Sequence, residues 1–474
     1  MRRVLVTVLL LVTSLSATDR ARHYRSVLKH YTPRDRVTGR YQYVPFDIPR
    51  NTGTLRLRYE YDRANGENVV DLGLFEPGSL DLGTRAFRGY SGGSKSSVIL
   101  SAAETTPGYR PGPLPPGEWH VLFGLYKVRD TGVDVTVTIE TEPLGNGEPP
   151  PPVCGSPPPT IRSRPSGPAW FTGALHAHTT HSDGVMSPLQ LWLKFRDAGF
   201  DFVAITDHNN TTHADNLACL DTLPPPDPLW IIGEEITTPA GHANVWGLKR
   251  DDWIDFRVTK GDSRLKDLVG AAHSRGALFV VNHPVSECAG CSWEHPFVEG
   301  IDGLEISNGR HSEVKGALAV WDELLRSGRR LTGVGSSDWH GPPNAIDTAN
   351  VRVYAEALTT DSILAGLRAG RVIVMNNARD STPAFDIDVG GHKVGIGDSV
   401  PQPASAQIQV AVRADGLTDG ELVAISNGVR LAPAPISGSA KMILPIEPGY
   451  VRFELYARDG SFYAATDPIF LTPR

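Results

Sequence analysis

Short hydrophobic runs alternate with polar residues through the first part of the chain, and Gly, Pro and Asp interrupt them. A period of two is typical of strands that bury one face, and no stretch there has helical spacing. We therefore expect a β-sandwich accessory domain at residues 18–144, which is either structural or binds a carbohydrate or partner. Its predicted strands are Thr54–Tyr61, Val69–Phe75, Ser97–Ser101, His120–Tyr126 and Val133–Glu140.

A proline-rich segment follows this domain. Residues 145–159 contain seven prolines, and proline fixes φ and removes a backbone hydrogen-bond donor. We expect a semi-rigid linker at residues 145–165 instead of a folded element.

From residue 166 the pattern changes to strands that alternate with amphipathic helices. Ser187, Pro188 and Gln190 supply an N-cap, a proline at the first helical position and a capping-box partner, and Gly199 ends that helix. Repeated strand and helix segments favour a parallel sheet closed into a barrel at residues 166–377. Further helices are predicted at Ser263–Arg275, Glu313–Ser327 and Asp361–Ala369, and strands at Phe202–Ile205, Leu229–Ile232, Leu278–Val281, Leu304–Ile306, Leu331–Gly335 and Arg371–Met375.

The period of two returns after residue 377. Asp459 and Gly460 are typical of a hairpin turn between two of the runs. We expect an immunoglobulin-like β domain at residues 378–474. Its predicted strands are Ala406–Arg413, Leu422–Asn427, Lys441–Pro445, Tyr450–Ala457 and Phe462–Ala465.

The N-terminus has the features of an export signal. Arg2 and Arg3 precede the apolar run Val4–Val12, and small residues surround Ala17. The run is too short to span a bilayer, so we expect a signal peptide at residues 1–17 and export to the bacterial periplasm or the cell exterior. No later segment predicts a membrane span. The net charge of -7 gives no general reason to expect nucleic acid as a partner.

Export changes the interpretation of the four cysteines. Cys288 and Cys291 form a C-x-x-C pair, which in a cytosolic protein would suggest half a zinc ribbon or a redox pair. In an oxidising compartment we expect one or two structural disulfides among these two, Cys154 and Cys219. Their spacing leaves the pairing open.

Histidines are concentrated in the central region, where eleven of the 15 lie between His176 and His340. His176 and His178 are one residue apart, which places both rings on one side of a strand. Imidazole nitrogens and carboxylate oxygens bind zinc, iron and manganese. The ends of parallel barrel strands meet at one face, so side chains there predict a metal cluster. They are Asp207 and His208, Glu234 and Glu235, Asn282 and His283, and Asp338 and His340.

The segments HAH, SDG, TDHN, GEE, NHP and SDWH resemble the motifs of the PHP (polymerase and histidinol phosphatase) superfamily of metal-dependent hydrolases. The leader, the GHANVWG and LEISNG segments and the C-terminal β domain most resemble its CehA/McbA-like metallohydrolase branch. The likeness spans residues 171–375, is weaker toward the C-terminus and is absent from the first domain. It implies a distorted (β/α)7 TIM-like barrel that binds two or three divalent zinc, manganese or iron ions.

The resemblance also implies nine metal ligands. Glu235 is favoured over Glu234 because the family has the glutamate just before an aliphatic residue, here Ile236. Position 183 is Asp or His among relatives, which leaves open the metal at the third site. The implied ligands are His176, His178 and Asp338 for the first metal, Glu235 as a bridge with His242 and His283 for the second, and Asp183, His208 and His340 for the third.

Other polar residues near these segments have more than one interpretation. His181 and His213 are either loop histidines in solvent or substrate contacts. Glu305 lies within a predicted strand and can face either side. Arg310 follows a strand end, beside Asn308 and His311, and its planar fork suits an anionic group. The remaining candidates are Asn209 and Asn282, which would orient ligands, and His273 on a predicted helix.

These features predict an exported hydrolase in which metal ions convert water to hydroxide, with Asp338, His340 and Arg310 as catalytic residues. A phosphoesterase acting on a small anionic phosphodiester or phosphomonoester is favoured. The alternatives are an ester, carbamate or amide hydrolase, and a module that binds glycan or protein and has a structural metal site. No nucleophile elbow, Walker loop or dinucleotide motif occurs. The oligomeric state stays open.

Overall fold

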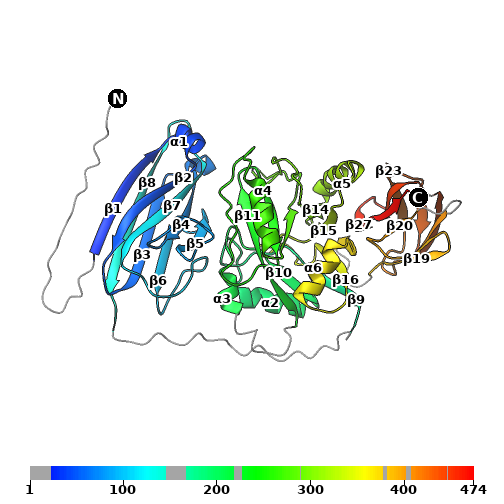
Figure 1. Cartoon of the computed structure of the whole chain (residues 1–474), viewed down its shortest axis with the longest axis horizontal. Coiled ribbons are helices and arrows are strands. Elements are labelled where there is room, and N and C mark those ends of the chain that lie inside the picture. Colours follow the sequence, from blue (N-terminus) through cyan, green and yellow to red (C-terminus); the bar gives the residue numbers. More distant parts are fainter. Residues whose placement is uncertain are drawn as a thin grey trace. The chain divides into compact units, whose positions relative to one another are not determined.

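The computed structural model describes residues 23–145, 167–217, 227–288, 290–376, 382–401, 407–445 and 447–473. The chain divides into two compact units, Met1–Ser156 and Pro157–Arg474 (Figure 1). The expected leader, Cys154, Cys219 and all but the first residue of the expected linker lie outside the described residues. Among the described helices, none is long and apolar enough to cross a membrane.

The N-terminal unit contains two four-stranded antiparallel sheets, with strand orders β1-β8-β3-β6 and β2-β7-β4-β5. All five strands predicted from the sequence are present. The strands are β1 (His23–Tyr31), β2 (Tyr41–Ile48), β3 (Thr52–Tyr61), β4 (Val69–Phe75), β5 (Phe87–Gly92), β6 (Ser97–Ser101), β7 (Gly117–Lys127) and β8 (Val133–Pro143), with the short helices α1 (Pro33–Thr38) and η1 (Ala64–Gly66).

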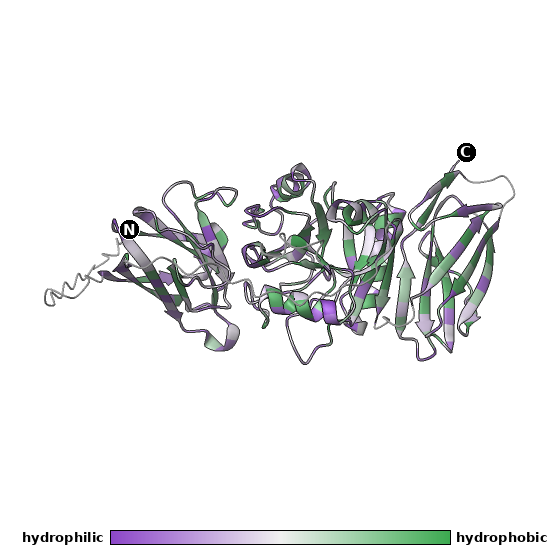
Figure 2. Ribbon diagram, turned by 90° about the horizontal axis from the view of Figure 1, so that it is seen from below, coloured by the Kyte–Doolittle hydropathy of each residue, from purple (hydrophilic) through white to green (hydrophobic). Residues whose placement is uncertain are grey.

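Alternation along each strand produces the core of this sandwich. On β3, Leu55, Leu57 and Tyr59 are buried, whereas Arg56 and Arg58, which alternate with them, are exposed. The buried side chains of both sheets form one hydrophobic cluster. Figure 2 shows the same alternation of hydrophobic and hydrophilic residues along the strands. Because each fully buried Leu contributes about 1.5–3 kcal/mol, the sheets are held face to face by this layer.

The second unit is built on a row of strands in the order β15-β14-β13-β12-β11-β10-β9-β16-β17. Parallel pairs join β9, β10 and β11, and also β13, β14 and β15. However, β12 is antiparallel to both neighbours, as is β16. The strands are β9 (Ala169–Ala174), β10 (Phe202–Ile205), β11 (Leu229–Thr238), β12 (Gly241–Trp246), β13 (Leu278–Val281), β14 (Gly303–Ser307), β15 (Thr332–Gly335), β16 (Ala349–Ala355) and β17 (Val372–Asn376).

The sheet is therefore mixed, and the expectation of a wholly parallel sheet was wrong. The row curls so that the chain after β9 meets the chain after β15, where Ala177 bridges to Trp339 and the His178 amide donates to the Trp339 carbonyl at 2.9 Å. The contact is between the segments that follow these strands; β9 and β15 do not pair with each other. A closed (β/α)7 barrel stays a prediction, whereas a mixed α/β unit in which strands dominate is present.

The prediction for strand β11 also needs correction. The sequence placed its end at Ile232, before Glu234 and Glu235, but β11 continues to Thr238 and turns directly into β12. Glu235 thus lies inside a hairpin strand instead of following a strand end. The hairpin was missed because a β-turn at Pro239 and Ala240 lacks the glycine-rich pair that is typical of short hairpins.

Helices pack on the strands as their patterns predict (Figure 1). In α4, residues Leu265, Leu268, Val269 and Ala272 are buried, which is the spacing of one helix face. The helices are α2 (Pro188–Asp197) on β10, α4 (Leu265–Ser274) on β13, α5 (His311–Arg326) on β14 and α6 (Thr360–Arg368) on β16, with the short α3 (His213–Leu217).

The start of α2 matches its predicted capping box. The Gln190 amide donates to Ser187 Oγ at 3.3 Å, and the Ser187 amide donates to Gln190 Oε1 at 2.9 Å. Pro188 is the first helical residue, where its missing N–H costs nothing. Gly199 has φ of +87°, which a residue with a side chain rarely adopts, and turns the chain toward β10.

The C-terminal region is a second pair of sheets that joins the central row, because β27 pairs with β17. Ile373 and Met375 of β17 belong to its hydrophobic core. The strands are β18 (Ala384–Val389), β19 (His392–Val394), β20 (Ser399–Pro401), β21 (Gln407–Arg413), β22 (Gly420–Ser426), β23 (Val429–Arg430), β24 (Ala434–Ile436), β25 (Ser439–Pro445), β26 (Gly449–Ala457), β27 (Phe462–Thr466) and β28 (Ile469–Thr472).

A buried arginine ties α5 to this C-terminal sheet. Arg452 on β26 is fully buried and donates to Asp322 of α5 at 2.6 and 3.0 Å and to Glu454 at 2.5 Å. Its guanidinium also lies 4.9 Å from the ring centre of Trp321. Since α5 begins at the functional site described below, this network fixes the far end of a helix that supports the site.

We predict that Arg452→Ala destabilises the second unit by about 3–5 kcal/mol, because it leaves the buried carboxylate of Glu454 and the partly buried carboxylate of Asp322 without this cation. Chemical unfolding followed by tryptophan fluorescence measures the loss. Arg458→Ala is the matched control: its guanidinium is 83% exposed and pairs with Asp419 at 3.0 Å, so the expected cost is below about 1 kcal/mol. Equal unfolding midpoints for the two variants would contradict the assignment.

Candidate metal centre

One buried carboxylate, that of Glu235, lies at the centre of the site. The β11–β12 hairpin places Glu235 and Thr237 on the same face as His242 and Asn244, because side chains alternate along each strand. Glu235 is fully buried. Five histidines surround it, and the nitrogen-to-oxygen distances are 3.2 Å from His176, 3.6 Å from His178, 2.6 Å from His208, 3.3 Å from His242 and 3.4 Å from His283.

Asp338 is the second carboxylate of the cluster. It follows β15, and its Oδ1 lies 3.1 Å from His176 Nε2 and 3.0 Å from His178 Nε2. Its φ of +48° is in the left-handed region, which costs a non-glycine residue roughly 1–3 kcal/mol. This backbone turns the side chain back onto the histidines that follow β9.

Asp183 forms the solvent-facing edge of the cluster. Its Oδ1 lies 3.5 Å from His208 Nε2 and 3.3 Å from His340 Nε2. The side chains of Asp183, His208 and His340 are 44, 23 and 35% exposed, whereas those of His176, His178 and Glu235 are fully buried. The cluster thus has a buried part and an open part.

The structure brings together all nine side chains that were predicted as ligands. Four groups of three or four have one nitrogen or oxygen each within 4.8 Å of one another. They are His178, Asp183, His208 and His340; His176, His178 and Glu235; His176, His283 and Asp338; and His208, Glu235 and His242.

Five buried polar atoms of the cluster make no hydrogen bond within the described part of the chain. An unsatisfied buried donor or acceptor costs about 1–3 kcal/mol, so several in one place indicate a missing partner. Lone pairs of nitrogen and carboxylate oxygen suit zinc, manganese and iron. The residues therefore fit divalent transition metals. The atoms without a hydrogen bond are His176 Nε2, Glu235 Oε2, both ring nitrogens of His242, and His283 Nδ1.

The charges of the cluster are strongly coupled. Burial raises the pKa of Glu235, but the surrounding imidazoles, His208 and His176 foremost, outweigh it and hold that pKa well below its usual range. Burial, together with His340 and His208, lowers the pKa of His178 to about 4. His178 is therefore neutral at physiological pH and keeps a lone pair for a metal.

Asn282 and Asn209, which the sequence suggested as residues that orient ligands, both form hydrogen bonds to β11. Asn282 donates from Nδ2 to Glu235 Oε1 at 2.7 Å, and its Oδ1 accepts from the Asn244 amide at 3.2 Å. Asn209 makes paired bonds with the backbone of Thr237 at 2.8 and 3.0 Å. These amides fix the carboxylate and the hairpin that holds it.

Two of the loop histidines are buried in a structural network, so the solvated interpretation was wrong for both. His181 Nδ1 lies 2.6 Å from Thr212 Oγ1, and His213 Nδ1 lies 3.1 Å from Asp207. Asp207 also accepts from the Thr179 amide at 2.7 Å, which anchors the loop after His178. Neither histidine belongs to a metal-binding group among the described residues.

His273 lies on the outer side of α4, where its Nε2 is 2.9 Å from Asp302. It belongs to no potential metal-binding group among the described residues. Glu305, which the sequence left free to face either side, points at the site and lies 3.0 Å from His176. A carboxylate inside an otherwise buried strand was the signal for such a contact, since a buried charge needs a partner.

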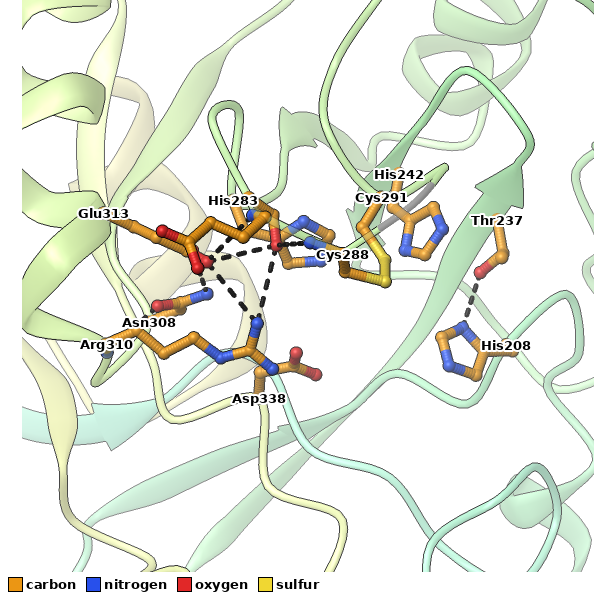
Figure 3. Close-up of a disulfide and its surroundings, with 12 residues drawn as sticks. His208, Thr237, His242, His283, Cys288, Cys291, Asn308, Arg310, Glu313 and Asp338 are labelled. Atoms are coloured by element: carbon orange, nitrogen blue, oxygen red, sulfur yellow. Dashed lines mark hydrogen bonds and ion pairs between the residues drawn. A yellow bond between two sulfur atoms is a disulfide. The ribbon is translucent and has the colours of Figure 1, made fainter. Parts of the chain in front are cut away.

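The rim of the site carries Arg310 and a disulfide-closed loop (Figure 3). Glu313 accepts from Asn308 at 3.1 Å and from Ser286 at 3.2 Å, and lies 3.5 Å from Arg310 Nη1. Figure 3 shows Arg310 extending toward the side on which Asp338 lies. Its side chain is 55% exposed and so remains open to a ligand.

Cys288 and Cys291 are joined by a disulfide in the loop that follows His283. This pairing is one of those that the sequence left open. Ser292 and Trp293 bond back to the Pro284 carbonyl at 3.1 Å, so the loop closes on itself beside the cluster. Trp293 in turn packs against Gly241 at the start of β12.

No protein-family model and no curated protein matches the chain. Among solved structures it is similar to a two-domain protein containing a predicted PHP-like metal-dependent phosphoesterase from Bacteroides vulgatus, with 17% identity, a TM-score of 0.40, and coverage of 66% of this chain and 100% of the other. It is also similar to an amidohydrolase from Chromobacterium violaceum, with 14% identity, a TM-score of 0.28, and coverage of 44% and 98%.

We predict that Glu235→Gln reduces the metal content of the purified protein more than Asp183→Asn does, because Glu235 belongs to two potential metal groups and Asp183 to one. Elemental analysis after reconstitution with manganese or zinc gives the stoichiometry. Glu234→Gln is the matched control, since this neighbour accepts from the Ile254 amide at 2.9 Å and belongs to no group among the described residues. An unchanged stoichiometry in Glu235→Gln would refute the prediction.

Proposed function

We propose that the protein is an exported metal-dependent hydrolase that uses two or three divalent zinc, manganese or iron ions. The carrying observation is the Glu235 carboxylate with five histidine nitrogens within 3.6 Å. When bound, such ions lower the pKa of water and polarise the oxygen that gains charge during hydrolysis. The proposed ligands are His176, His178, Asp183, His208, Glu235, His242, His283, Asp338 and His340.

The open edge of the cluster is the proposed side of substrate entry. His340 is 35% exposed there, and its Nδ1 lies 2.9 Å from the backbone carbonyl oxygen of Asp338 and 3.6 Å from its carboxylate. We assign these two residues to proton transfer toward the leaving group, because an imidazole beside a carboxylate can give up and regain a proton. Arg310 at the rim binds the non-reacting anionic part of the substrate.

Charge favours a phosphoester over a neutral ester. Three divalent ions would carry about six positive charges, and the carboxylates of Asp183, Glu235 and Asp338 offset only about half of them. Arg310 adds a further positive charge, partly balanced by Glu313 at 3.5 Å. A small phosphodiester or phosphomonoester matches this balance best. An ester, carbamate or amide is the alternative substrate for the same site, as the resemblance to the CehA/McbA-like branch allows.

A binding module with a merely structural metal site is the alternative of another class. Structural zinc sites are closed, with about four ligands that leave no open position. Here nine ligand-type residues form a cluster, and Asp183 is 44% exposed at its edge. This excess of ligands and the open edge favour the enzyme. The first β-sandwich, with its proposed boundary at residues 145–165, would then be an accessory domain.

We predict a higher kcat/KM for nitrophenyl phosphodiesters or phosphomonoesters than for nitrophenyl esters or carbamates with the same leaving group. The measurement uses metal-loaded full-length protein, with chelator-treated protein as the blank. A tenfold advantage of the neutral substrates, about 1.4 kcal/mol in transition-state binding, would overturn the phosphoesterase proposal and leave the metal site standing. Equal rates of hydrolysis with metal-loaded and chelator-treated protein would overturn the proposal of a metal-dependent hydrolase.

We predict that Arg310→Ala raises the KM for an anionic substrate by about 10–100-fold, because a hydrogen bond to a charged group contributes roughly 1.5–3 kcal/mol. The KM for a neutral ester should stay the same, which separates loss of anion binding from general damage. Arg264→Ala serves as the control, because this arginine pairs with Asp262 at 2.6 Å away from the site. A similar loss on both substrates would count against the role of Arg310.

A further inference from the structure

Glu305 on β14 lies behind the metal centre with both of its carboxylate oxygens directed at residues of the cluster. It is only 2% exposed, it lies in the LEISNG segment, and it belongs to none of the four ligand groups. We propose that Glu305 is a positioning residue that holds His176 and His283 in their metal-binding geometry. This inference rests on the proposed metal-dependent function and extends it to the residue that makes the buried part of the cluster rigid.

The first contact sets the tautomer of His176. Glu305 Oε1 lies 3.0 Å from His176 Nδ1, so the imidazole donates its Nδ1 proton to the carboxylate. Its Nε2 then carries the lone pair and points between Glu235 and Asp338, at 3.2 and 3.1 Å. A carboxylate behind a ligating histidine fixes the ring and increases its basicity. His178 lacks this direct support, because its Nδ1 faces the Ser182 hydroxyl at 3.4 Å.

The second contact holds a strained backbone. His283 has φ of +25°, a conformation that residues with side chains rarely adopt. Its amide donates to Glu305 Oε2 at 3.0 Å, and its ring reaches Glu235 with Nε2 at 3.4 Å. A strained conformation persists only where surrounding contacts fix it. Glu305 supplies such a contact at the residue that carries the ligand.

The carboxylate of Glu305, on β14, therefore contacts two histidines: His176, which follows β9, and His283, which follows β13. Within the described chain its ion pair is with His176 alone, and no lysine or arginine pairs with it. An amide in its place has one acceptor and one donor. It can accept from His176 or from the His283 amide, but its NH2 group would then face the other N–H.

The test is a titration of apoprotein with zinc against a competing fluorescent chelator, for wild type, Glu305→Gln and Glu313→Gln. We expect the tightest zinc equivalents of Glu305→Gln to weaken by about 10–100-fold and the weakest equivalent, at the exposed Asp183 edge, to stay the same. Glu313→Gln is the matched control, because its buried carboxylate bonds Ser286 and Asn308 and no histidine. Its zinc affinities should equal those of wild type.

Two results would overturn the inference while leaving the metal site intact. One is unchanged zinc affinity in Glu305→Gln. The other is uniform weakening of all equivalents together with a lower melting temperature of the apoprotein, which marks a structural role only. If wild type itself binds no zinc, manganese or iron, the proposed function fails instead.

A second measurement holds even if Glu305→Gln does not fold. Nitrogen-15 NMR of histidine-labelled, zinc-loaded wild type should show His176 protonated at Nδ1 and metallated at Nε2. The signals of His176 are assigned by their absence from the spectrum of His176→Asn. Metallation at Nδ1 would exclude the bond to Glu305 and overturn the inference.

Discussion

The burial of the Glu235 carboxylate among five imidazoles is the constraint on which this site depends. A buried carboxylate without compensation would be protonated, yet the histidines hold the pKa of Glu235 well below its usual range. The imidazoles in turn place several nitrogen lone pairs close together around this carboxylate, so the lone pairs repel one another. Protons relieve only part of this crowding, since His178 is neutral at physiological pH. Divalent cations satisfy both the carboxylates and the lone pairs, which is why the arrangement is best understood as a metal centre.

The rest of the second unit serves to hold that arrangement. The β11–β12 hairpin presents Glu235 and His242 from paired strands, and the junction of Ala177 with Trp339 brings His178 to Asp338. Positive φ values at Asn209, His283 and Asp338 lie within this region. Strain of this kind persists where neighbouring contacts fix it, here the bond between Asn209 and the backbone of Thr237 and the bond from the His283 amide to Glu305. Tertiary contacts thus stabilise a local backbone geometry that these segments would not adopt in isolation.

Much of the site was predictable from sequence because its ligands lie in short local motifs. His176 and His178 share a strand face by their spacing, and the strand ends before His208 and His283 are marked by clear apolar runs. The all-β first unit and the capped helix α2 followed from the same local signals. Orientation was harder to predict. Strand β12, which runs antiparallel to β11, was not predicted at all, so the extent of β11 and the true setting of Glu235 were missed.

Side chains that act through long-range contacts were also missed. The direction of Glu305 depends on the pairing of β14 with β13 and β15, which no local pattern encodes. His181 lies in a polar loop and His213 at the start of α3, and only the packing around Asp207 and Thr212 shows that they are buried. The Cys288–Cys291 pairing was one of several that the spacing allowed. In each case the sequence identified the residue, and tertiary contacts determined what it does.

The central claim is that Glu235 collects metal ions at this place, and anomalous diffraction from crystals of manganese- or zinc-loaded protein tests it most directly. The account predicts anomalous peaks at the absorption edge of the added metal within about 2.0–2.2 Å of Glu235 oxygens and of histidine nitrogens from the surrounding set. Peaks confined to other parts of the protein, or a fully ordered cluster with no peak at all in metal-loaded crystals, would contradict it.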